Sequence, residues 1–269
     1  MRALLTDFRL PTALILAMIA VMAATVPTRA QNSEQPVACI APADLTHFAF
    51  PLSRMAKQLA SGKPITIIAI GSSSTAGAGA SSPAASYPSR LAVELKRRFP
   101  NREIAVLNRG VNGEEARDML TRFETGVIAD KPDLVLWQLG TNSVLRDRPL
   151  TDANQLIQEG LRKLKAIGAD VVLIDSQYAP KVIAKHDVAT MVGIIATAAK
   201  QGHVNLFDRY AVMRHWREVK GIPFNAFLSA DELHMNDWSY GCIAKLLAAA
   251  IAEAMTRPAM TATKSSSAH

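Results

Sequence analysis

The stretch "ITIIAIGSSST" (Ile65–Thr75) joins a run of apolar residues to a turn of small polar ones. A short, nearly continuous apolar run rich in β-branched residues is typical of a strand that is buried on both faces. The glycine after it permits a tight turn, and a helical turn there would present backbone N–H groups outward. We therefore expect a buried strand that delivers three serines to the edge of a sheet.

Further apolar segments alternate with amphipathic ones along the rest of the chain. This alternation predicts a parallel sheet with helices on both faces, an α/β fold. We expect a domain over residues 63–256, preceded by a helical segment at 31–62 and followed by a disordered tail at 257–269. The predicted strands are 65–70, 104–107, 133–139, 171–174 and 204–207, and the main predicted helices are 87–99, 114–123, 155–167, 185–200 and 237–255.

The N-terminus has the layout of a secretory signal peptide. Arg2 and Arg9 precede an apolar run over residues 12–26, and small residues lead to a cleavage site after Ala30. The run is shorter than the about 20 residues of a membrane-spanning helix, so we expect no stable span after cleavage. This predicts a periplasmic or secreted protein over residues 31–269. In an oxidising compartment Cys39 and Cys242 either form a disulfide or are two unrelated buried thiols.

Charge and motif content exclude several function classes. The formal net charge is +7, but the basic residues are scattered apart from Lys96-Arg97-Arg98. Without a basic stripe interleaved with aromatic residues, we expect no nucleic-acid partner. No H-E-x-x-H or paired-cysteine pattern is present, so we expect no metal and no cofactor.

Four polar segments fall after predicted strands or in the last loop, and each has an ordinary structural explanation. Residues 71–75 are compatible with a plain polar loop, 108–113 with an Asn-Gly turn, and 140–143 with a helix cap. The first lacks the lysine of a phosphate-binding loop and the second glycine of a G-x-S-x-G elbow. However, sites in doubly wound sheets form at the carboxyl ends of strands, where these segments meet.

The fourth segment brings an acid close to a base. Asp231 precedes His234 by three residues, in a loop just before the final predicted helix. In a turn, this spacing lets the carboxylate reach the imidazole Nδ1–H and leaves Nε2 free as a base.

Together the four segments resemble those of the SGNH (GDSL-type) hydrolase superfamily, which supply Ser, Gly, Asn and His in this chain order. The resemblance implies a three-layer, flavodoxin-like sandwich with a mainly parallel five-stranded sheet. It also implies a nucleophile at Ser73, although Ser72 stands where the family's G-D-S-x-T motif has aspartate. The implied triad is Ser73, Asp231 and His234, and the implied oxyanion hole is Ser73, Gly110 and Asn142.

The resemblance implies a serine esterase that works through an acyl-enzyme. The export signal and the small residues at 76–85 beside the serine favour deacetylation of a carbohydrate or cell-envelope polymer. One alternative is a lysophospholipase or thioesterase, with Phe224, Phe227 and Leu228 lining an acyl channel. Others are an O-acetyltransferase of the same fold and a non-catalytic glycan-binding protein. The sequence leaves the oligomeric state open.

Overall fold

The computed structural model describes residues 38–257, so the predicted signal peptide at 1–30 and nearly all of the predicted tail lie outside the described residues. These residues form an α/β fold around a sheet of five parallel strands in the order β2-β1-β3-β4-β5, which confirms the predicted fold class. The strands are β1 (Ile65–Gly71), β2 (Ile104–Gly110), β3 (Leu134–Gln138), β4 (Asp170–Ile174) and β5 (Asn205–Phe207).

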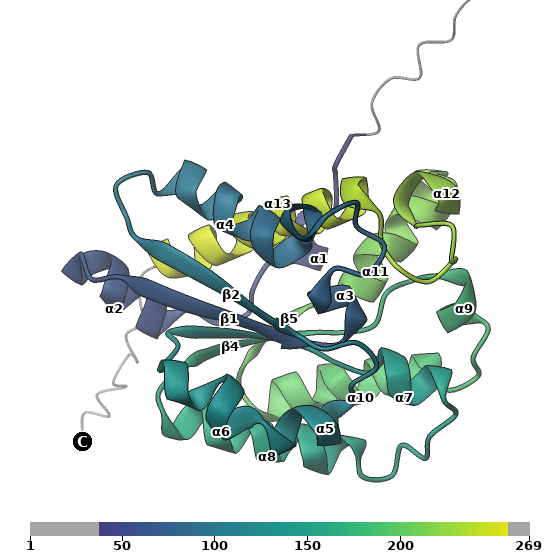
Figure 1. The fold of residues 1–269 in the computed structure, drawn as a ribbon, viewed down its shortest axis with the longest axis horizontal. Coiled ribbons are helices and arrows are strands. Elements are labelled where there is room, and N and C mark those ends of the chain that lie inside the picture. The colour runs from purple at the N-terminus through teal and green to yellow at the C-terminus, as the bar shows by residue number, and fades with distance from the viewer. Residues whose placement is uncertain (1–37, 258–269) are drawn as a thin grey trace, which may run out of the picture. The chain divides into compact units, whose positions relative to one another are not determined.

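Helices cover both faces of the sheet (Figure 1). One face carries α4 (Tyr87–Arg98) and α13 (Asp237–Thr256), and the other carries α5 (Ala116–Thr121), α6 (Phe123–Gly126), α8 (Ala153–Ala166) and α10 (Val188–Gln201). The remaining α-helices are short and mostly flank the strand ends: α1 (Ala43–Thr46), α2 (Ser53–Ser61), α3 (Ser73–Ala76), α7 (Thr141–Leu145), α9 (Pro180–Ile183), α11 (Arg209–Arg214) and α12 (Phe224–Phe227).

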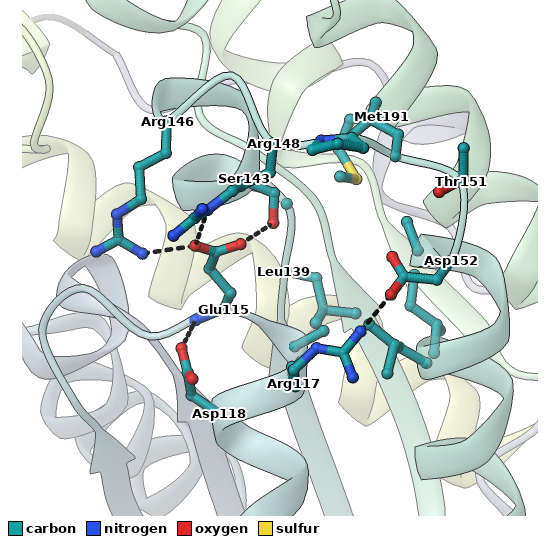
Figure 2. A pocket seen from close by; sticks show the side chains of 17 residues that line it. Glu115, Arg117, Asp118, Leu139, Ser143, Arg146, Arg148, Thr151, Asp152 and Met191 are labelled. Atoms are coloured by element: carbon teal, nitrogen blue, oxygen red, sulfur yellow. Dashed lines mark hydrogen bonds and ion pairs between the residues drawn. The ribbon is translucent and has the colours of Figure 1, made fainter.

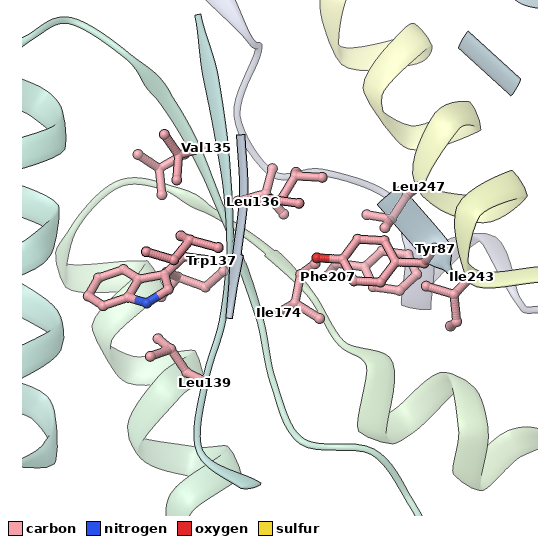
Figure 3. Packing of buried hydrophobic residues seen from close by; sticks show 14 of the residues in the cluster. Tyr87, Val135, Leu136, Trp137, Leu139, Ile174, Phe207, Ile243 and Leu247 are labelled. Carbon is pink, nitrogen blue, oxygen red and sulfur yellow. The ribbon is translucent and has the colours of Figure 1, made fainter. Parts of the chain in front are cut away.

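The central strand β3 shows why the apolar runs are nearly continuous. Figure 3 shows Trp137 and Leu139 on one side of the sheet, and Leu136 on the other side with Tyr87 and Ile243. All five side chains are buried. A strand with helices on both faces has no solvent side, so alternate positions need no polar residue.

Two predicted helices are each divided in the structure. The apolar pattern around Pro51 forms α1 and α2, and residues 47–52 between them are not helical. Proline disfavours a helical conformation in the residue before it. The predicted helix 114–123 begins only at Ala116, where Glu115 and Asp118 form a capping box, and is interrupted at Arg122 before α6.

The N-terminal segment is fastened to the domain by polar contacts and one covalent bond. At the amino edge of the sheet, Asp133 accepts hydrogen bonds from Arg54 Nε at 2.8 Å and Gln58 Nε2 at 2.9 Å. Cys39 forms a disulfide with Cys242 of α13, which decides between the two alternatives left open by the sequence. Within residues 38–257, no helix combines the length and the apolar composition needed to cross a membrane.

Candidate active site

Ser73 is the first residue of α3, directly beyond the carboxyl end of β1. The preceding Ser72 is buried, and both its N–H and its hydroxyl donate to Gln138 Oε1, at 2.9 and 3.0 Å. Thr75 also donates to this oxygen, at 3.3 Å. The serine that replaces the family's aspartate therefore keeps the turn bonded to β3, and Ser73 is the partly exposed serine of the three.

His234 and Asp231 lie next to Ser73 in space. The Ser73 hydroxyl is 2.8 Å from His234 Nε2, and His234 Nδ1 is 2.5 Å from Asp231 Oδ2. A carboxylate only accepts hydrogen bonds, so this contact places the proton of a neutral imidazole on Nδ1. Nε2 is then an acceptor that faces the serine hydroxyl, which is the arrangement a general base needs.

The turn around Asp231 keeps its carboxyl group ionised. The other carboxylate oxygen accepts from Ser229 Oγ at 2.7 Å and from the backbone N–H groups of Leu233 and His234 at 3.0 and 2.9 Å. Partial burial raises the pKa of Asp231, but these bonds and the bond from the His234 ring outweigh it and hold the pKa well below its usual range.

The start of α13 is tied to the loop that follows the nucleophile. Tyr240 donates its hydroxyl to the Ala78 carbonyl at 2.6 Å, and Asp237 accepts from the Ser81 backbone N–H at 2.7 Å. Asn236 caps α13 by accepting from Ser239 N. These contacts fix the distance between the Ser73 turn and the His234 loop, although the two are 161 residues apart in sequence.

The N–H of Gly110, which was predicted to be an oxyanion donor, already has a hydrogen-bond partner. Its N–H donates to Asn108 Oδ1 at 2.9 Å. A Cβ at Gly110 would lie 2.1 Å from the backbone nitrogen of Ala76, so glycine is required there for β2 to pack against α3. Three residues later, Gly113 adopts φ +81°, and its N–H has no hydrogen-bond partner within residues 38–257.

Asn142 is the second residue of α7, which follows the carboxyl end of β3. Its Nδ2 donates to the Glu114 carbonyl at 2.8 Å, which places it beside the loop that contains Gly113. An amide NH₂ carries two hydrogens, so one donor remains for a ligand. The Ser73 N–H likewise has no partner within the described residues.

A pocket of about 420 Å³ is lined by Glu115 and Ser143, the chain neighbours of Glu114 and Asn142. On one side of the pocket, Glu115 forms ion pairs with Arg146 and Arg148 and accepts a hydrogen bond from Ser143 (Figure 2). On the other side, Arg117 forms an ion pair with Asp152. Neither Ser73 nor His234 lines this pocket. Its lining also includes the apolar residues Leu139, Leu150, Leu156, Ile157 and Met191.

Two buried glutamines at the strand ends are functional candidates that sequence reasoning missed. Gln138 ends β3 and binds the Ser73 turn, while Gln177 follows β4 and contacts several loops. For Gln138, a polar residue at the end of an apolar strand was the available signal, since a buried amide requires specific partners.

Residues 38–257 match the model of the Non-GDSL lipase-like family. The chain belongs to this family. The family's description agrees with the Gly-Ser-Ser sequence at 71–73, which stands in place of Gly-Asp-Ser. Membership and the structural matches below confirm the resemblance to SGNH-like hydrolases.

Several known proteins resemble this member of the Non-GDSL lipase-like family. An acetylxylan esterase of Geobacillus stearothermophilus is 42% identical over 52 residues, which cover 19% of this chain and 24% of that protein. A two-domain esterase active on acetylated mannans matches with a TM-score of 0.68 and 18% identity, covering 79% of this chain and 56% of the other.

A solved acetylxylan esterase structure from G. stearothermophilus matches with a TM-score of 0.57 and 21% identity, over 72% of this chain and 95% of that one. The chain therefore spans about a quarter of the curated relative and just over half of the mannan esterase. At these identities the structural matches establish the fold.

Proposed function

We propose that this protein hydrolyses carboxylic esters with Ser73 as the nucleophile, His234 as the general base and Asp231 as its orienting acid. The observation that carries the proposal is the hydrogen-bond chain from Ser73 Oγ through His234 to Asp231. The two donor–acceptor distances are 2.8 and 2.5 Å. This hydrogen-bond chain joins residues from opposite ends of the domain, and neither end alone would supply the chemistry.

The chemistry proceeds in two halves. His234 Nε2 takes the hydroxyl proton as Ser73 Oγ bonds to the ester carbonyl carbon, which forms a tetrahedral intermediate. The protonated imidazole then passes this proton to the alcohol oxygen as the bond to the alcohol breaks. Water, activated by the same Nε2, releases the acid and restores Ser73. The ionised Asp231 stabilises the imidazolium in both halves.

The negative oxygen of the intermediate requires donors that are free in the resting enzyme. The Ser73 N–H and the second Nδ2 hydrogen of Asn142 meet this requirement. Since the Gly110 N–H is already bonded, we assign the third donor to Gly113, whose loop lies beside Asn142.

Acetylated carbohydrate is the substrate class that we favour. The known proteins that this chain resembles include an acetylxylan esterase and an esterase active on acetylated mannans. The segment beside Ser73 supports the same class, because Ser81, Ser82, Pro83 and Ala84 are small and exposed and leave room for a bulky polymer. Export to the periplasm or beyond fits this substrate and the Cys39–Cys242 disulfide.

A lysophospholipase or thioesterase activity is the second candidate, and the pocket beside Asn142 is the observation that favours it. Its apolar lining and volume of about 420 Å³ suit an acyl chain longer than acetyl. The channel predicted from Phe224, Phe227 and Leu228 does not support it, since Phe227 and Leu228 are buried in the core.

Hydrolysis of p-nitrophenyl esters from acetyl to palmitoyl tests the proposal, with wild type and Ser73→Ala compared. We expect activity on acetyl and other short esters that is abolished in the variant. Rates that increase with chain length would favour the lipid substrate. Acetyl transfer to an added glycan in preference to water would identify an O-acetyltransferase. A wild type without activity on any ester would contradict the proposal and favour a glycan-binding protein. A fully active variant would contradict the assignment of Ser73 as the nucleophile.

A further inference from the structure

Gln177 connects three separate loops at the carboxyl edge of the sheet. It follows β4 and is 1% exposed. Its Oε1 accepts hydrogen bonds from Thr141 Oγ1 at 2.9 Å, from Arg209 Nη2 at 3.0 Å and, more weakly, from Ser74 Oγ at 3.4 Å. Its Nε2 donates to the Leu233 carbonyl at 3.3 Å.

The loop partners of Gln177 are direct chain neighbours of the residues assigned to catalysis. Ser74 follows Ser73, Thr141 precedes Asn142, and Leu233 precedes His234. One side chain therefore contacts the segments that carry the nucleophile, an oxyanion donor and the base. These segments come from α3, from α7 and from the loop before α13, and no single element of the fold holds all of them.

Arg209 fixes which way the Gln177 amide faces. This arginine is 1% exposed, and its Nε and Nη2 donate to the Asp175 carbonyl at 3.0 and 2.6 Å. A guanidinium has only donors, so the amide oxygen must face it. A flipped amide would set its NH₂ against Arg209 while losing the bond to Leu233, and the buried polar atoms would be left unpaired.

We propose that Gln177 is a positioning residue that holds Ser73, Asn142 and His234 in one geometry, an inference that rests on the ester-hydrolase function proposed above. Arg209 orients the amide oxygen, and the opposite Nε2 then holds the backbone directly before His234. Misplacement of reacting groups by 1 Å can cost about 10²-fold in rate, so loss of these bonds reduces turnover before it reduces ester binding.

The test compares Gln177→Met with Asn205→Leu. Asn205 is also a buried amide, and it binds the backbone N–H and C=O of Phe50 at the opposite edge of the sheet. The readouts are kcat and KM on p-nitrophenyl acetate, the rate of fluorophosphonate labelling at Ser73, and the unfolding temperature. For Gln177→Met we expect kcat and labelling to fall about 10- to 100-fold with KM within about twofold of wild type. For Asn205→Leu we expect a lower unfolding temperature and an unchanged kcat per folded molecule.

Gln177→Glu distinguishes the role of the accepting Oε1 from that of the donating Nε2. A carboxylate still accepts from Thr141 and Arg209, but it has no donor for the Leu233 carbonyl. We expect a folded protein whose kcat on p-nitrophenyl acetate and labelling rate fall, as in Gln177→Met. If Gln177→Met does not fold, this variant and Thr141→Val, which removes a single bond, carry the test.

Wild-type kcat and labelling rates per folded molecule in the Gln177 variants would overturn the positioning role. A wild type that neither hydrolyses esters nor reacts with the fluorophosphonate would instead contradict the proposed function itself. The two failures are therefore distinguishable.

Discussion

The two edges of the sheet carry aspartates with similar hydrogen bonding and different surroundings. At the amino edge, the Asp133 side chain is 4% exposed and accepts from Arg54, Gln58 and the Thr66 N–H. At the carboxyl edge, the Asp231 side chain is 43% exposed and binds the His234 ring and nearby N–H groups. Burial raises the pKa of both carboxyl groups, and in both the hydrogen bonds outweigh it and lower the pKa.

The hydrogen-bond partner of each carboxylate distinguishes the structural role of Asp133 from the catalytic role proposed for Asp231. The Arg54 guanidinium only donates hydrogen bonds, so its bond to Asp133 holds α2 against the sheet and offers no acceptor to a nucleophile. The neutral His234 imidazole has one donor nitrogen and one acceptor nitrogen, and the nitrogen that does not face Asp231 faces the Ser73 hydroxyl group. Similar hydrogen bonds thus stabilise the fold at one edge and prepare a nucleophile at the other.

The largest expected effect is on catalysis at the carboxyl edge. Asp231→Asn should lower kcat by about 10⁴-fold, because the imidazolium loses its counter-charge and the tautomer is no longer fixed. The Asn oxygen can still accept from the Leu233 and His234 N–H groups, so the unfolding temperature should change little. Ester kinetics and thermal unfolding of the same preparation check both statements. A variant with near wild-type kcat would remove the distinction between the two aspartates.

Asn142→Ala should lower kcat by about 10²–10³-fold through loss of one oxyanion donor. Asn112→Ala is the matched control, because Asn112 is exposed in the neighbouring loop and has no hydrogen-bond partner within residues 38–257. Steady-state kinetics on p-nitrophenyl acetate measure the difference. Equal rates for the two variants would exclude Asn142 from the oxyanion hole.

Removal of the disulfide should reduce stability without changing the chemistry. Cys39→Ala combined with Cys242→Ala releases a link between residues 203 positions apart. The expected loss is about 2–4 kcal/mol in the free energy of unfolding, measured with denaturant. We expect kcat per folded molecule to remain that of wild type. A matching fall in kcat would show that the disulfide also positions the His234 loop through α13.

The smallest expected effect belongs to the amino edge. Asp133→Asn should cost about 1.5–3 kcal/mol of stability, since Arg54 and Gln58 lose a charged acceptor, and it should leave kcat per folded molecule unchanged. Because the folded-state pKa of Asp133 is lowered, its contribution is complete above the ordinary aspartate pKa of about 3.9. The contribution is lost as the pH falls through the lowered folded-state value.

Denaturant unfolding of wild type and Asp133→Asn between pH 7 and pH 3 measures this dependence. The stability difference should be constant down to about pH 5 and shrink below about pH 4. A difference that grows in acid would contradict the assigned direction of the pKa shift.

Sequence reasoning reached the fold because the strands are buried on both faces. The continuous apolar run at 65–70 left little doubt about a parallel sheet, and helical periodicity located α4 and α13 within a few residues. The three-residue spacing of Asp231 and His234 indicated an acid–base pair, and the resemblance to the SGNH superfamily implied Ser73 as the nucleophile.

The sequence did not reveal which glycine donates to the oxyanion or which loops Gln177 contacts, because both depend on side-chain partners in different loops. The Asn-x-Gly-Val-Asn-Gly segment offers two glycines, and only the bond from the Gly110 N–H to Asn108 distinguishes them. The bonds from Gln177 to Thr141 and Leu233 join residues 36 and 56 positions apart, and no local pattern encodes them. The disulfide could be suspected from two cysteines but needed the fold to bring them together.

The central claim is that Ser73, the middle serine of the Ser72-Ser73-Ser74 run, is a nucleophile activated by His234. Peptide mass spectrometry after treatment with a fluorophosphonate tests it most directly, with wild type and His234→Ala compared. The account predicts a single adduct on Ser73 in wild type and almost none in the variant. An adduct on Ser72 or Ser74, equal labelling of both proteins, or no adduct on wild type would contradict it.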